Sequence, residues 1–192
     1  TKLDKDVLNN FFKIAGKELD FSIIAPFQSK KEFQLNNNNS ELLETDKVEG
    51  FAMFLNMKKF QHIGFFDENF FLYLEEIDLC KRVKNKNGKI FIAPNIKIFH
   101  SGGQSVNENF STQIELTRNW HWMWSLFYFN KKHYNYFYSL ILVSPKFFSA
   151  LFKSFFYMII FNNKKSEIYK KRLSGLFNSI LGKSSWYRPS LH

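Results

Sequence analysis

Apolar residues in the first quarter of the chain follow two different patterns. In residues 7–15 they recur every three or four positions, which predicts an amphipathic helix that Gly16 ends. Residues 21–25 are apolar except for Ser22, which predicts a buried strand that Pro26 stops. Residues 28–47 contain a run of Asn and no sustained period, so we expect a surface loop there.

The middle of the chain alternates strand and helix patterns. Residues 48–57 are rich in β-type residues, and Gly50 allows another group to approach the backbone closely. "KKFQHI" predicts a short helix with a left-handed cap at Gly64, and "EEIDLCKRVKNKNG" predicts a helix that its Asn87-Gly88 pair closes. Two short strands are expected around Pro94. This order indicates an α/β or mixed sheet with binding sites at the carboxyl ends of its strands, although these strands are too few to complete such a sheet.

The composition changes sharply from Trp120 onward. Residues 120–165 are dominated by aromatic and aliphatic side chains with scattered lysines, and no run of about 18 uncharged apolar residues appears. This pattern predicts helices that lie in a membrane interface, with lysine stems snorkelling and Trp and Tyr at headgroup level. The alternative is a helical hairpin that packs on the protein's own core or on a partner.

Charge and aromatic content narrow the classes of partner. The 192 residues include 25 Phe and carry a formal net charge of +10, which suits nucleic acid, an anionic membrane surface or a phosphate-bearing substrate. Because the aromatics cluster in Phe-rich apolar runs, we expect no nucleic-acid partner. The single cysteine, Cys80, excludes a disulfide framework within this sequence and a cysteine-based zinc site. The sequence begins at Thr1, and we expect it to be part of a longer protein.

Three carboxylates fall within four positions at Glu75, Glu76 and Asp78. On a helix, Glu75 and Asp78 share a face, whereas Glu76 points elsewhere, and Asp78 stands four residues before Arg82, the spacing of an ion pair. One interpretation is a well-capped helix start, since acids in a first turn suit the helix dipole. The other is that the preceding aromatic segment, "GFFDENFFLYL", desolvates a carboxylate and raises its pKa, as a general base requires.

A second candidate lies at "HSGGQS", just after a predicted strand end. His100 there is followed by two glycines, so it could ligate a metal or contact a phosphate while the backbone comes close to a ligand.

Taken together, these motifs resemble a known family. Residues 48–105 resemble the second half of the catalytic domain of family 2 glycosyltransferases, especially the bacterial rhamnosyltransferase-like branch. That branch shows a Gly-containing strand, then "GxFDExFFxYxEDxDLCxR", a strand, a Pro and "HxGGxS", in the order found here. "LTRN" and "RLSGLFNSILGK" near the end of the chain also resemble the tail of that branch.

The resemblance implies roles for particular residues. The second acid of the family's "ED" pair is its usual catalytic base, and Glu76 occupies that position with a side chain one methylene longer than Asp. Gly50 matches the strand that approaches the donor sugar. His100 matches a histidine that helps to bind the divalent metal in some relatives. Substrate-binding positions are implied beside the acceptor pocket, and Asp78 with Arg82 would support the helix; the implied substrate-binding residues are Gly50, Asp67, Glu68 and Glu75.

The resemblance also implies an architecture and an activity. Residues 1–115 would form the acceptor-side half of a GT-A domain, a mixed α/β sheet with flanking helices, and residues 116–192 a helical, aromatic and basic membrane-associating extension. The family's Asp-x-Asp motif, which holds Mn2+ or Mg2+ and the nucleotide diphosphate, would lie before Thr1, so we expect this chain alone to be inactive. The expected activity is transfer of a sugar, with inversion, from a nucleotide-sugar donor to a glycan or lipid-linked acceptor in bacterial cell-surface polysaccharide synthesis. The expected location is the cytoplasmic face of the cell membrane, as a peripheral protein; the alternative is a non-catalytic membrane-interface binding module.

Overall fold

The computed structural model describes residues 5–17, 20–29, 42–99 and 111–189. Contacts divide the chain into two compact units. The α/β unit contains residues 1–67 and 75–104, and the helical unit contains residues 68–74 and 105–192. The boundary that the sequence suggested between residues 115 and 116 falls inside a helix, Ser111–His133.

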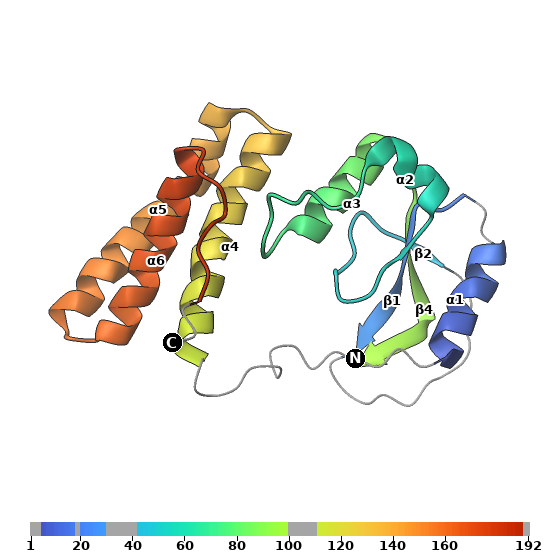
Figure 1. Ribbon diagram of the computed structural model, residues 1–192, viewed down its shortest axis with the longest axis horizontal. Helices are drawn as coiled ribbons and strands as arrows, with labels where there is room; N and C mark the ends of the chain where they lie inside the picture. The colour runs from blue at the N-terminus through green and yellow to red at the C-terminus, as the bar shows by residue number, and fades with distance from the viewer. Residues whose placement is uncertain (1–4, 18–19, 30–41, 100–110, 190–192) are drawn as a thin grey trace. The chain divides into compact units, whose positions relative to one another are not determined.

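The α/β unit contains a mixed sheet with helices on its faces (Figure 1). The strand order is β2-β4-β1-β3, in which β1 and β4 are parallel while β2 and β3 pair antiparallel to β4 and β1 at the edges. The predicted mixed α/β class is therefore confirmed. In chain order the elements are α1 (Lys5–Lys17), β1 (Ile23–Ser29), β2 (Leu43–Glu44), β3 (Phe54–Leu55), α2 (Met57–Ile63), α3 (Glu75–Asn85) and β4 (Ile90–Phe99).

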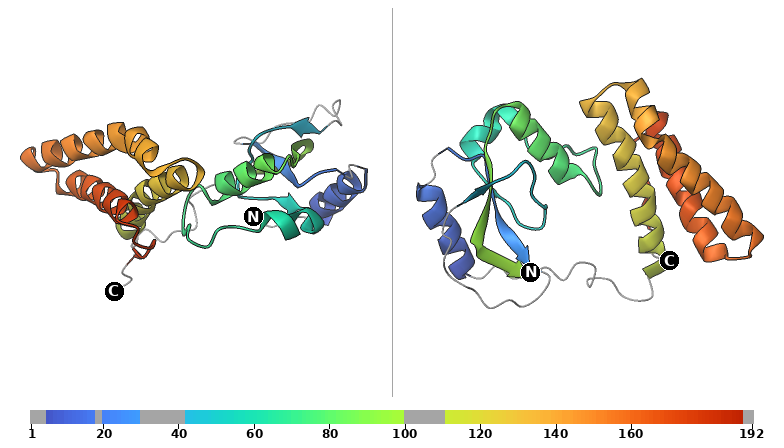
Figure 2. Two further views of the ribbon diagram at one scale, coloured as in Figure 1. Left: turned by 90° about the horizontal axis from the view of Figure 1, so that it is seen from above. Right: turned by 180° about the vertical axis from the view of Figure 1, so that it is seen from behind.

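Both faces of this sheet are covered. Because successive side chains of a strand point to opposite faces, neighbours on β1 enter different clusters. Ile23 packs with Phe60 of α2 and Leu79 of α3, whereas Ile24 packs with Phe11 of α1. The unit therefore buries its strands between α1 on one side and α2 and α3 on the other, as Figure 2 shows from two further directions.

Two strand predictions were wrong at their prolines. β1 does not stop at Pro26 but continues to Ser29, and β4 is one strand through Pro94 where two short strands were predicted. The parallel pairing shifts register between Pro26 and Phe27, where Pro26 faces Ala93 and Phe27 faces Lys97. Proline has no N–H for the ladder, so the two prolines stand at an irregularity that lets both strands continue.

The expectations for the surrounding segments held only in part. Residues 30–41 lie outside the described residues, but Leu43–Glu44 forms the edge strand β2, so the predicted loop over 28–47 is wrong at both ends. Within residues 48–57 only Phe54–Leu55 is a strand. A two-residue edge strand is too short for local sequence to specify, because its stability comes from the neighbouring strand.

The helix ends followed the sequence more closely. α1 covers the predicted helix and ends at Lys17, one residue past Gly16. α2 ends before Gly64, as predicted, but Gly64 has φ 77° and ψ 161°, so it is not the predicted left-handed helical cap. α3 is closed by Asn87 at φ 55° and Gly88, whose N–H groups bond to the carbonyls of Lys84 and Val83. This is a Schellman closure, and the Asn-Gly pair predicted it.

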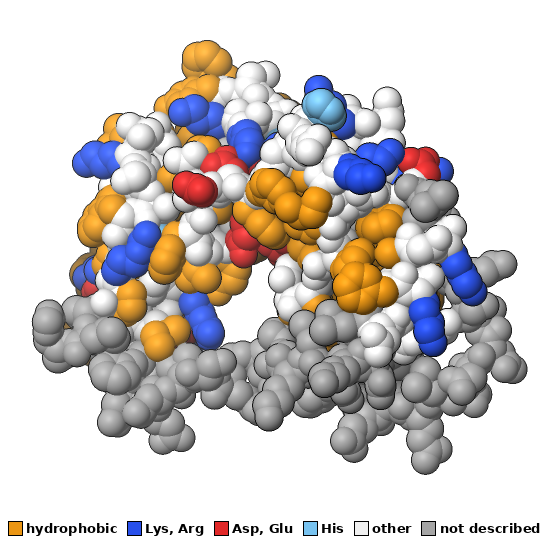
Figure 3. Space-filling view, turned by 45° about the vertical axis from the view of Figure 1, so that its right-hand side comes forward, with side chains coloured by type: hydrophobic (Ala, Val, Ile, Leu, Met, Phe, Trp, Pro, Cys, Tyr) orange, Lys and Arg blue, Asp and Glu red, His pale blue; other side chains and the backbone are white. Residues whose placement is uncertain are grey.

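The helical unit contains α4 (Ser111–His133), α5 (Tyr136–Ile159) and α6 (Asn163–Ile180). The predicted helical character of this region is confirmed. α5 and α6 begin after asparagine caps, since the side chain of Asn135 accepts from Tyr138 N and that of Asn162 accepts from Lys165 N. α4, α5 and α6 lie side by side (Figures 1 and 2). Figure 3 shows hydrophobic side chains and Lys or Arg side chains together on one face of the molecule.

Close contact between α4 and α6 depends on one glycine. A Cβ added to Gly175 of α6 would lie 2.1 Å from the carbonyl oxygen of Trp120 on α4, so only glycine allows this approach. Trp120 is fully buried beside this contact, and its indole Nε1 donates to Ser174 Oγ at 3.1 Å. The core of the unit consists of Met123, Phe127, Val143 and Leu176.

Candidate functional site

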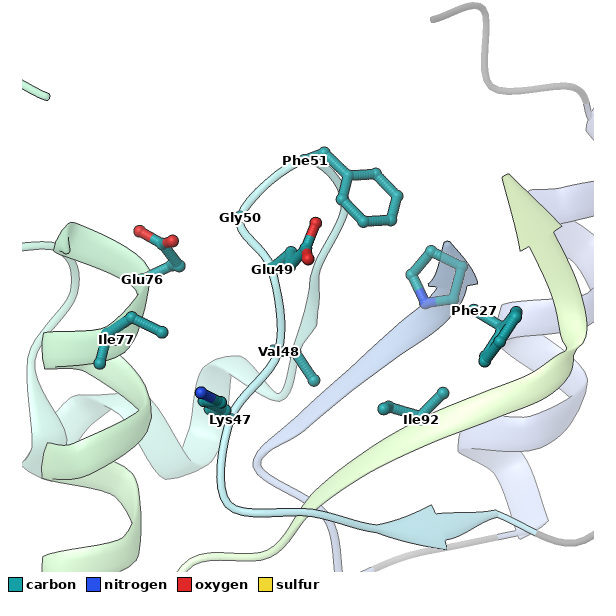
Figure 4. A pocket seen from close by; sticks show the side chains of 10 residues that line it. Phe27, Lys47, Val48, Glu49, Gly50, Phe51, Glu76, Ile77 and Ile92 are labelled. Atoms are coloured by element: carbon teal, nitrogen blue, oxygen red, sulfur yellow. The ribbon is translucent and has the colours of Figure 1, made fainter. Parts of the chain in front are cut away.

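Glu76 lines a cavity of about 740 Å3 in the α/β unit (Figure 4). This volume lies within the range of roughly 300–1,000 Å3 that ligand pockets occupy in proteins. The cavity is bounded by the first turn of α3, the loop before β3, and the strands β1 and β4. Its lining residues are Pro26, Phe27, Lys47, Val48, Glu49, Gly50, Phe51, Glu76, Ile77 and Ile92.

The environment of Glu76 raises the pKa of its carboxyl above the usual 4.5. The largest cause is desolvation by burial, and the negative charges of Glu75 and Glu49 act in the same direction. The backbone N–H groups of Glu76 and Ile77, at the start of α3, act the other way because they bond to the ionised form. A carboxylate whose pKa is raised beside a cavity is a stronger proton acceptor than one in water.

Gly50 is the position where Glu76 approaches the neighbouring loop. A Cβ added to Gly50 would lie 3.2 Å from Cβ of Glu76, so the missing side chain leaves room for this glutamate. The predicted close approach to Gly50 thus exists, and the group that approaches is Glu76 itself. Figure 4 shows Glu76 on α3 and Glu49, Gly50 and Phe51 on the adjacent loop.

Asp78 and Arg82 form the ion pair that their spacing suggests. Arg82 Nε lies 2.8 Å from Asp78 Oδ2, and the carboxylate of Asp78 is fully buried. The other nitrogens of Arg82 donate to the carbonyls of Ile63, Gly64 and Phe65, at the end of α2. The pair therefore ties α2 to α3, and it removes Asp78 from the candidates for a solvent-accessible base.

The aromatic segment before the carboxylates makes contacts within the helical unit. Phe70, Phe71 and Tyr73 belong to the helical unit, where they contact Tyr128, His121 and Trp122 of α4 at ring centroid distances of 4.9, 4.8 and 5.6 Å. None of the three lines the cavity, whose aromatic members are Phe27 and Phe51. These contacts with α4 are long-range, so local sequence could not reveal them.

The backbone of the aromatic segment also accepts hydrogen bonds from other parts of the helical unit. Ser125 Oγ donates to the carbonyl of Leu72 at 2.7 Å, and Ser185 Oγ donates to that of Asn69 at 2.7 Å. Tyr73 and Leu74, the two residues before α3, both have φ of 69°. Such left-handed conformations cost non-glycine residues about 1–2 kcal/mol each, and strain of this kind is frequent next to functional sites.

The other predicted site residues have different positions. Glu75 lies in the first turn of α3, next to Glu76 but not in the cavity lining. Asp67 ends a segment of the α/β unit, whereas Glu68 is exposed and belongs to the helical unit. His100 lies outside the described residues. The cavity therefore brings Gly50 and Glu76 together, and it does not include Asp67, Glu68 or Glu75.

Sequence reasoning missed two charged residues of the cavity. Lys47 and Glu49 precede Gly50 in "DKVEGF" and line the same cavity as Glu76. Their position beside a glycine already selected for close approach was the available signal. Glu49 also contributes to the raised pKa of Glu76, so the site combines two carboxylates with one cation.

The described residues offer no ready metal site. Within residues 5–17, 20–29, 42–99 and 111–189, no group of three or more His, Cys, Asp or Glu side chains could hold a metal ion. The only cysteine, Cys80, is buried on α3 one helical turn after Glu76, and burial raises the pKa of its thiol.

Comparison of the chain with models of protein families, with curated proteins and with solved structures found no match in any of the three. The class that the fold defines is a mixed α/β unit joined to a helical unit.

Proposed function

We propose that this chain carries the acceptor-side half of an inverting GT-A glycosyltransferase, with Glu76 as its general base. The observation that carries the proposal is the position of Glu76: the carboxylate selected by the sequence motif lines a ligand-sized cavity and has a raised pKa. The mixed sheet with helices on both faces is compatible with part of a GT-A fold. The order of motifs in residues 48–105 gives the remaining support.

The proposed reaction is a single displacement. An acceptor hydroxyl in the cavity gives its proton to the carboxylate of Glu76 as its oxygen attacks the anomeric carbon of the donor sugar. The new glycosidic C–O bond forms on the face opposite the nucleotide, the old C–O bond to phosphate breaks, and the nucleoside diphosphate leaves with that electron pair. The result is inversion at the anomeric carbon.

Side chains around Glu76 have supporting roles in this proposal. Gly50 leaves the space in which Glu76 sits, and Lys47 brings a positive charge to the cavity that suits an anionic part of a substrate. A divalent metal, when bound, would stabilise the departing diphosphate, but we assign it no ligand among the described residues. The predicted role of His100 in metal binding stays a prediction.

The proposed partners follow the motif resemblance. The donor is a nucleotide sugar and the acceptor is a glycan or a lipid-linked glycan of the cell surface. A lipid-linked acceptor would place the reaction at the cytoplasmic face of the membrane, with the protein bound peripherally.

The test is donor turnover by the full-length protein with Mn2+ or Mg2+, across UDP-, GDP- and dTDP-sugars. Glu76→Gln keeps the size of the side chain but cannot accept the proton, so we expect turnover to fall by about 10²–10⁴-fold. Glu76→Asp should retain more activity than Glu76→Gln because it keeps the carboxylate. Glu44→Gln is the matched control, since Glu44 is an exposed carboxylate on β2 away from the cavity lining.

The outcomes separate the possible bases. Full turnover in a folded Glu76→Gln variant would contradict the assignment, and loss of turnover in Glu75→Gln instead would move the base to Glu75. A second candidate function, a membrane-interface module without catalysis, is favoured by the many exposed apolar side chains of α5. It predicts no turnover with any donor and only a change of stability in Glu76→Gln.

A further inference from the structure

An apolar stripe runs along the whole of α5. Its side chains are separated by three, four or seven positions, so they lie on one face of the helix. Each is between 56% and 77% exposed, although each is large and apolar. The apolar stripe consists of Phe137, Ile141, Phe148, Phe152, Phe155 and Ile159.

The opposite face of α5 is the one that packs within the helical unit. Val143 and Ala150 are 2% and 3% exposed, and Val143 belongs to the core with Met123 of α4 and Leu176 of α6. α5 thus already has its protein partners on one side. The apolar stripe is a second apolar face that these partners leave open.

α5 also differs from an ordinary core helix in its total exposure. Among the described residues it is the one helix long and apolar enough to cross a membrane by length and composition alone. Only 22% of its most apolar window is buried, whereas the core helix of a soluble protein is mostly buried. Pro145 interrupts its backbone bonding, and Ser144 Oγ donates to the carbonyl of Ile141 at 2.8 Å in its place. Such a substitution for a lost backbone bond is typical of helices in lipid.

The charge around the stripe is of one sign. No Asp or Glu occurs between Glu115 and Glu167, and the same stretch contains seven Lys and Arg residues. Lys146 and Lys153 are exposed, stand seven residues apart on α5, and therefore share one side of the helix. Both lysines lie on the side of α5 turned toward α6, since Lys153 Nζ lies 5.5 Å from the centroid of the Tyr169 ring and Lys146 lines a cavity with Arg172. They therefore add to the positive charge of the unit without flanking the stripe, and this charge attracts anionic headgroups over a distance of about a Debye length.

The turn after α5 carries an unusual phenylalanine. Phe161 is 88% exposed and has φ of 55°, in the left-handed region that glycine normally occupies at a helix end. The N–H groups of Phe161 and Asn162 bond to the carbonyls of Met158 and Tyr157, which completes a Schellman closure. A large apolar side chain in this strained and exposed position adds nothing to the packing of the unit, but it extends the apolar surface beyond the end of the stripe.

The charges of the neighbouring helix α6 indicate whether α5 lies in the membrane interface or crosses the bilayer. α6 returns beside α5 after a turn of a few residues and carries five cations and one Glu. If α5 crossed the bilayer, α6 would take these charges into the hydrocarbon, where each is costly. With α5 flat in the interface, the same charges stay at the headgroup level or in water.

We propose that the helical unit binds the surface of an anionic lipid bilayer by inserting the apolar stripe and Phe161, with α5 parallel to the membrane plane. The inference does not rest on the proposed transferase activity. Lipid is the occupant that fits both observations, an apolar face without acids and a surrounding excess of lysine.

The test is co-sedimentation of the full-length protein with vesicles of phosphatidylcholine, with or without phosphatidylglycerol. We expect binding to the anionic vesicles that weakens with added salt. Phe152→Ser with Phe155→Ser should reduce the partition coefficient about tenfold or more, because two large side chains no longer enter the apolar layer. Lys146→Gln should reduce binding to anionic vesicles at low salt by less than the roughly fivefold expected for a lysine at the headgroups, because Lys146 lies on the side of α5 away from the stripe. It should leave binding to neutral vesicles unchanged.

Two controls keep folding and insertion apart. Phe12→Ser removes a similarly exposed Phe from α1 of the α/β unit, and it should leave vesicle binding unchanged. Phe161→Gly should weaken vesicle binding while raising thermal stability, since glycine relieves the left-handed strain at this position. A variant that binds less because it unfolds would show the opposite change in stability.

Several results would overturn the proposal. Wild-type protein that stays in the supernatant, or stripe variants that sediment like wild type, would exclude membrane insertion through this face. Protein that resists alkaline carbonate extraction from cell membranes would show a spanning arrangement instead. If light scattering showed a dimer that the stripe substitutions dissociate without any vesicle binding, the occupant would be a second copy.

Discussion

The two units differ in their net charge and in how much apolar surface they leave exposed. The α/β unit, residues 1–67 and 75–104, contains 15 Lys and Arg and 13 Asp and Glu, whereas the helical unit, residues 68–74 and 105–192, contains 12 Lys and Arg and only 4 Glu. Of the net charge of +10, the helical unit therefore carries +8. The α/β unit covers both faces of its sheet with its own helices, while α5 of the helical unit leaves one full face open.

The difference shows that the average composition of a chain does not describe the charge and the exposed apolar surface of each of its units. A basic, Phe-rich chain suggests a basic, Phe-rich surface everywhere, but the α/β unit has a net charge of only +2 and uses Phe11, Phe21 and Phe60 as core. The α/β unit also exposes Phe12, Phe27, Phe65 and Phe66, but only the helical unit combines exposed aromatic side chains with a large excess of positive charge. This division agrees with the two proposals, a catalytic site in the α/β unit and a membrane-binding surface in the helical unit.

The chain contains a separate natural probe for each unit. All four tryptophans, at positions 120, 122, 124 and 186, lie in the helical unit, so their fluorescence follows its unfolding. Cys80, the only cysteine, is buried in the α/β unit, so its reactivity toward a thiol reagent follows the opening of that unit. Each stability prediction below can therefore be assigned to one unit.

The largest expected effect is that of Arg82→Met on the α/β unit. The substitution leaves the buried carboxylate of Asp78 without this cation and removes the donor to three carbonyls at the end of α2. We expect a loss of about 3 kcal/mol in the free energy of unfolding, measured by denaturant titration of Cys80 reactivity. Lys86→Met, at an exposed position near the end of α3, is the control. Equal stability of the two variants would show that the pair does not hold α2 to α3.

The next effect concerns the helical unit alone. Gly175→Ala would place a Cβ 2.1 Å from the carbonyl oxygen of Trp120, so α4 and α6 must move apart. We expect a loss of about 1–3 kcal/mol in denaturation followed by tryptophan fluorescence. Gly16→Ala on α1, where a Cβ would meet nothing within 4 Å, should instead leave stability unchanged or slightly higher. An unaltered tryptophan transition in Gly175→Ala would mean that the two helices are not held at this distance.

A smaller effect is the acid sensitivity of the helical unit. His121 is fully buried, its Nε2 lies 2.7 Å from the carbonyl of Tyr187, and burial lowers the pKa of its imidazole below the usual 6.5. Below pH 6.5 the unfolded chain takes up a proton that the folded unit does not, so stability falls as the pH drops through this window. We expect His121→Gln to lose this slope in thermal unfolding followed by tryptophan fluorescence, while exposed His62→Gln keeps it. The same slope in both variants would point to another group.

The smallest effect has the opposite sign and belongs to the α/β unit. Because burial raises the pKa of Glu76 above 4.5, its ionised form is less favourable in the folded than in the unfolded state. Glu76→Gln should therefore be more stable than wild type at neutral pH, and the difference should disappear below about pH 4.5. Melting temperatures across this range, together with Cys80 reactivity, measure it. A variant that is less stable than wild type at neutral pH would show that the carboxylate contributes to folding rather than opposing it.

Local sequence was sufficient where a structure depends on neighbours along the chain. The Asn-Gly pair predicted the closure of α3, the i,i+4 spacing indicated the ion pair of Asp78 with Arg82, and apolar periodicity predicted α1. Each of these depends on contacts within about one helical turn. Helical spacing also indicated that Glu76 points away from Glu75 and Asp78.

Tertiary structure determined which distant segment each strand or helix face packs against. β1 and β4 pass their prolines because each strand pairs with the other, and a break in one is bridged by the register shift. Phe70, Phe71 and Tyr73 contact residues of α4 that stand about 50 positions later in the chain. Periodicity gives the direction of a side chain but does not name its partner, because the partner is set by packing between distant segments. For the same reason the sequence determined that α5 is an apolar helix, and only the packing of α4 and α6 decided which of its faces stays open.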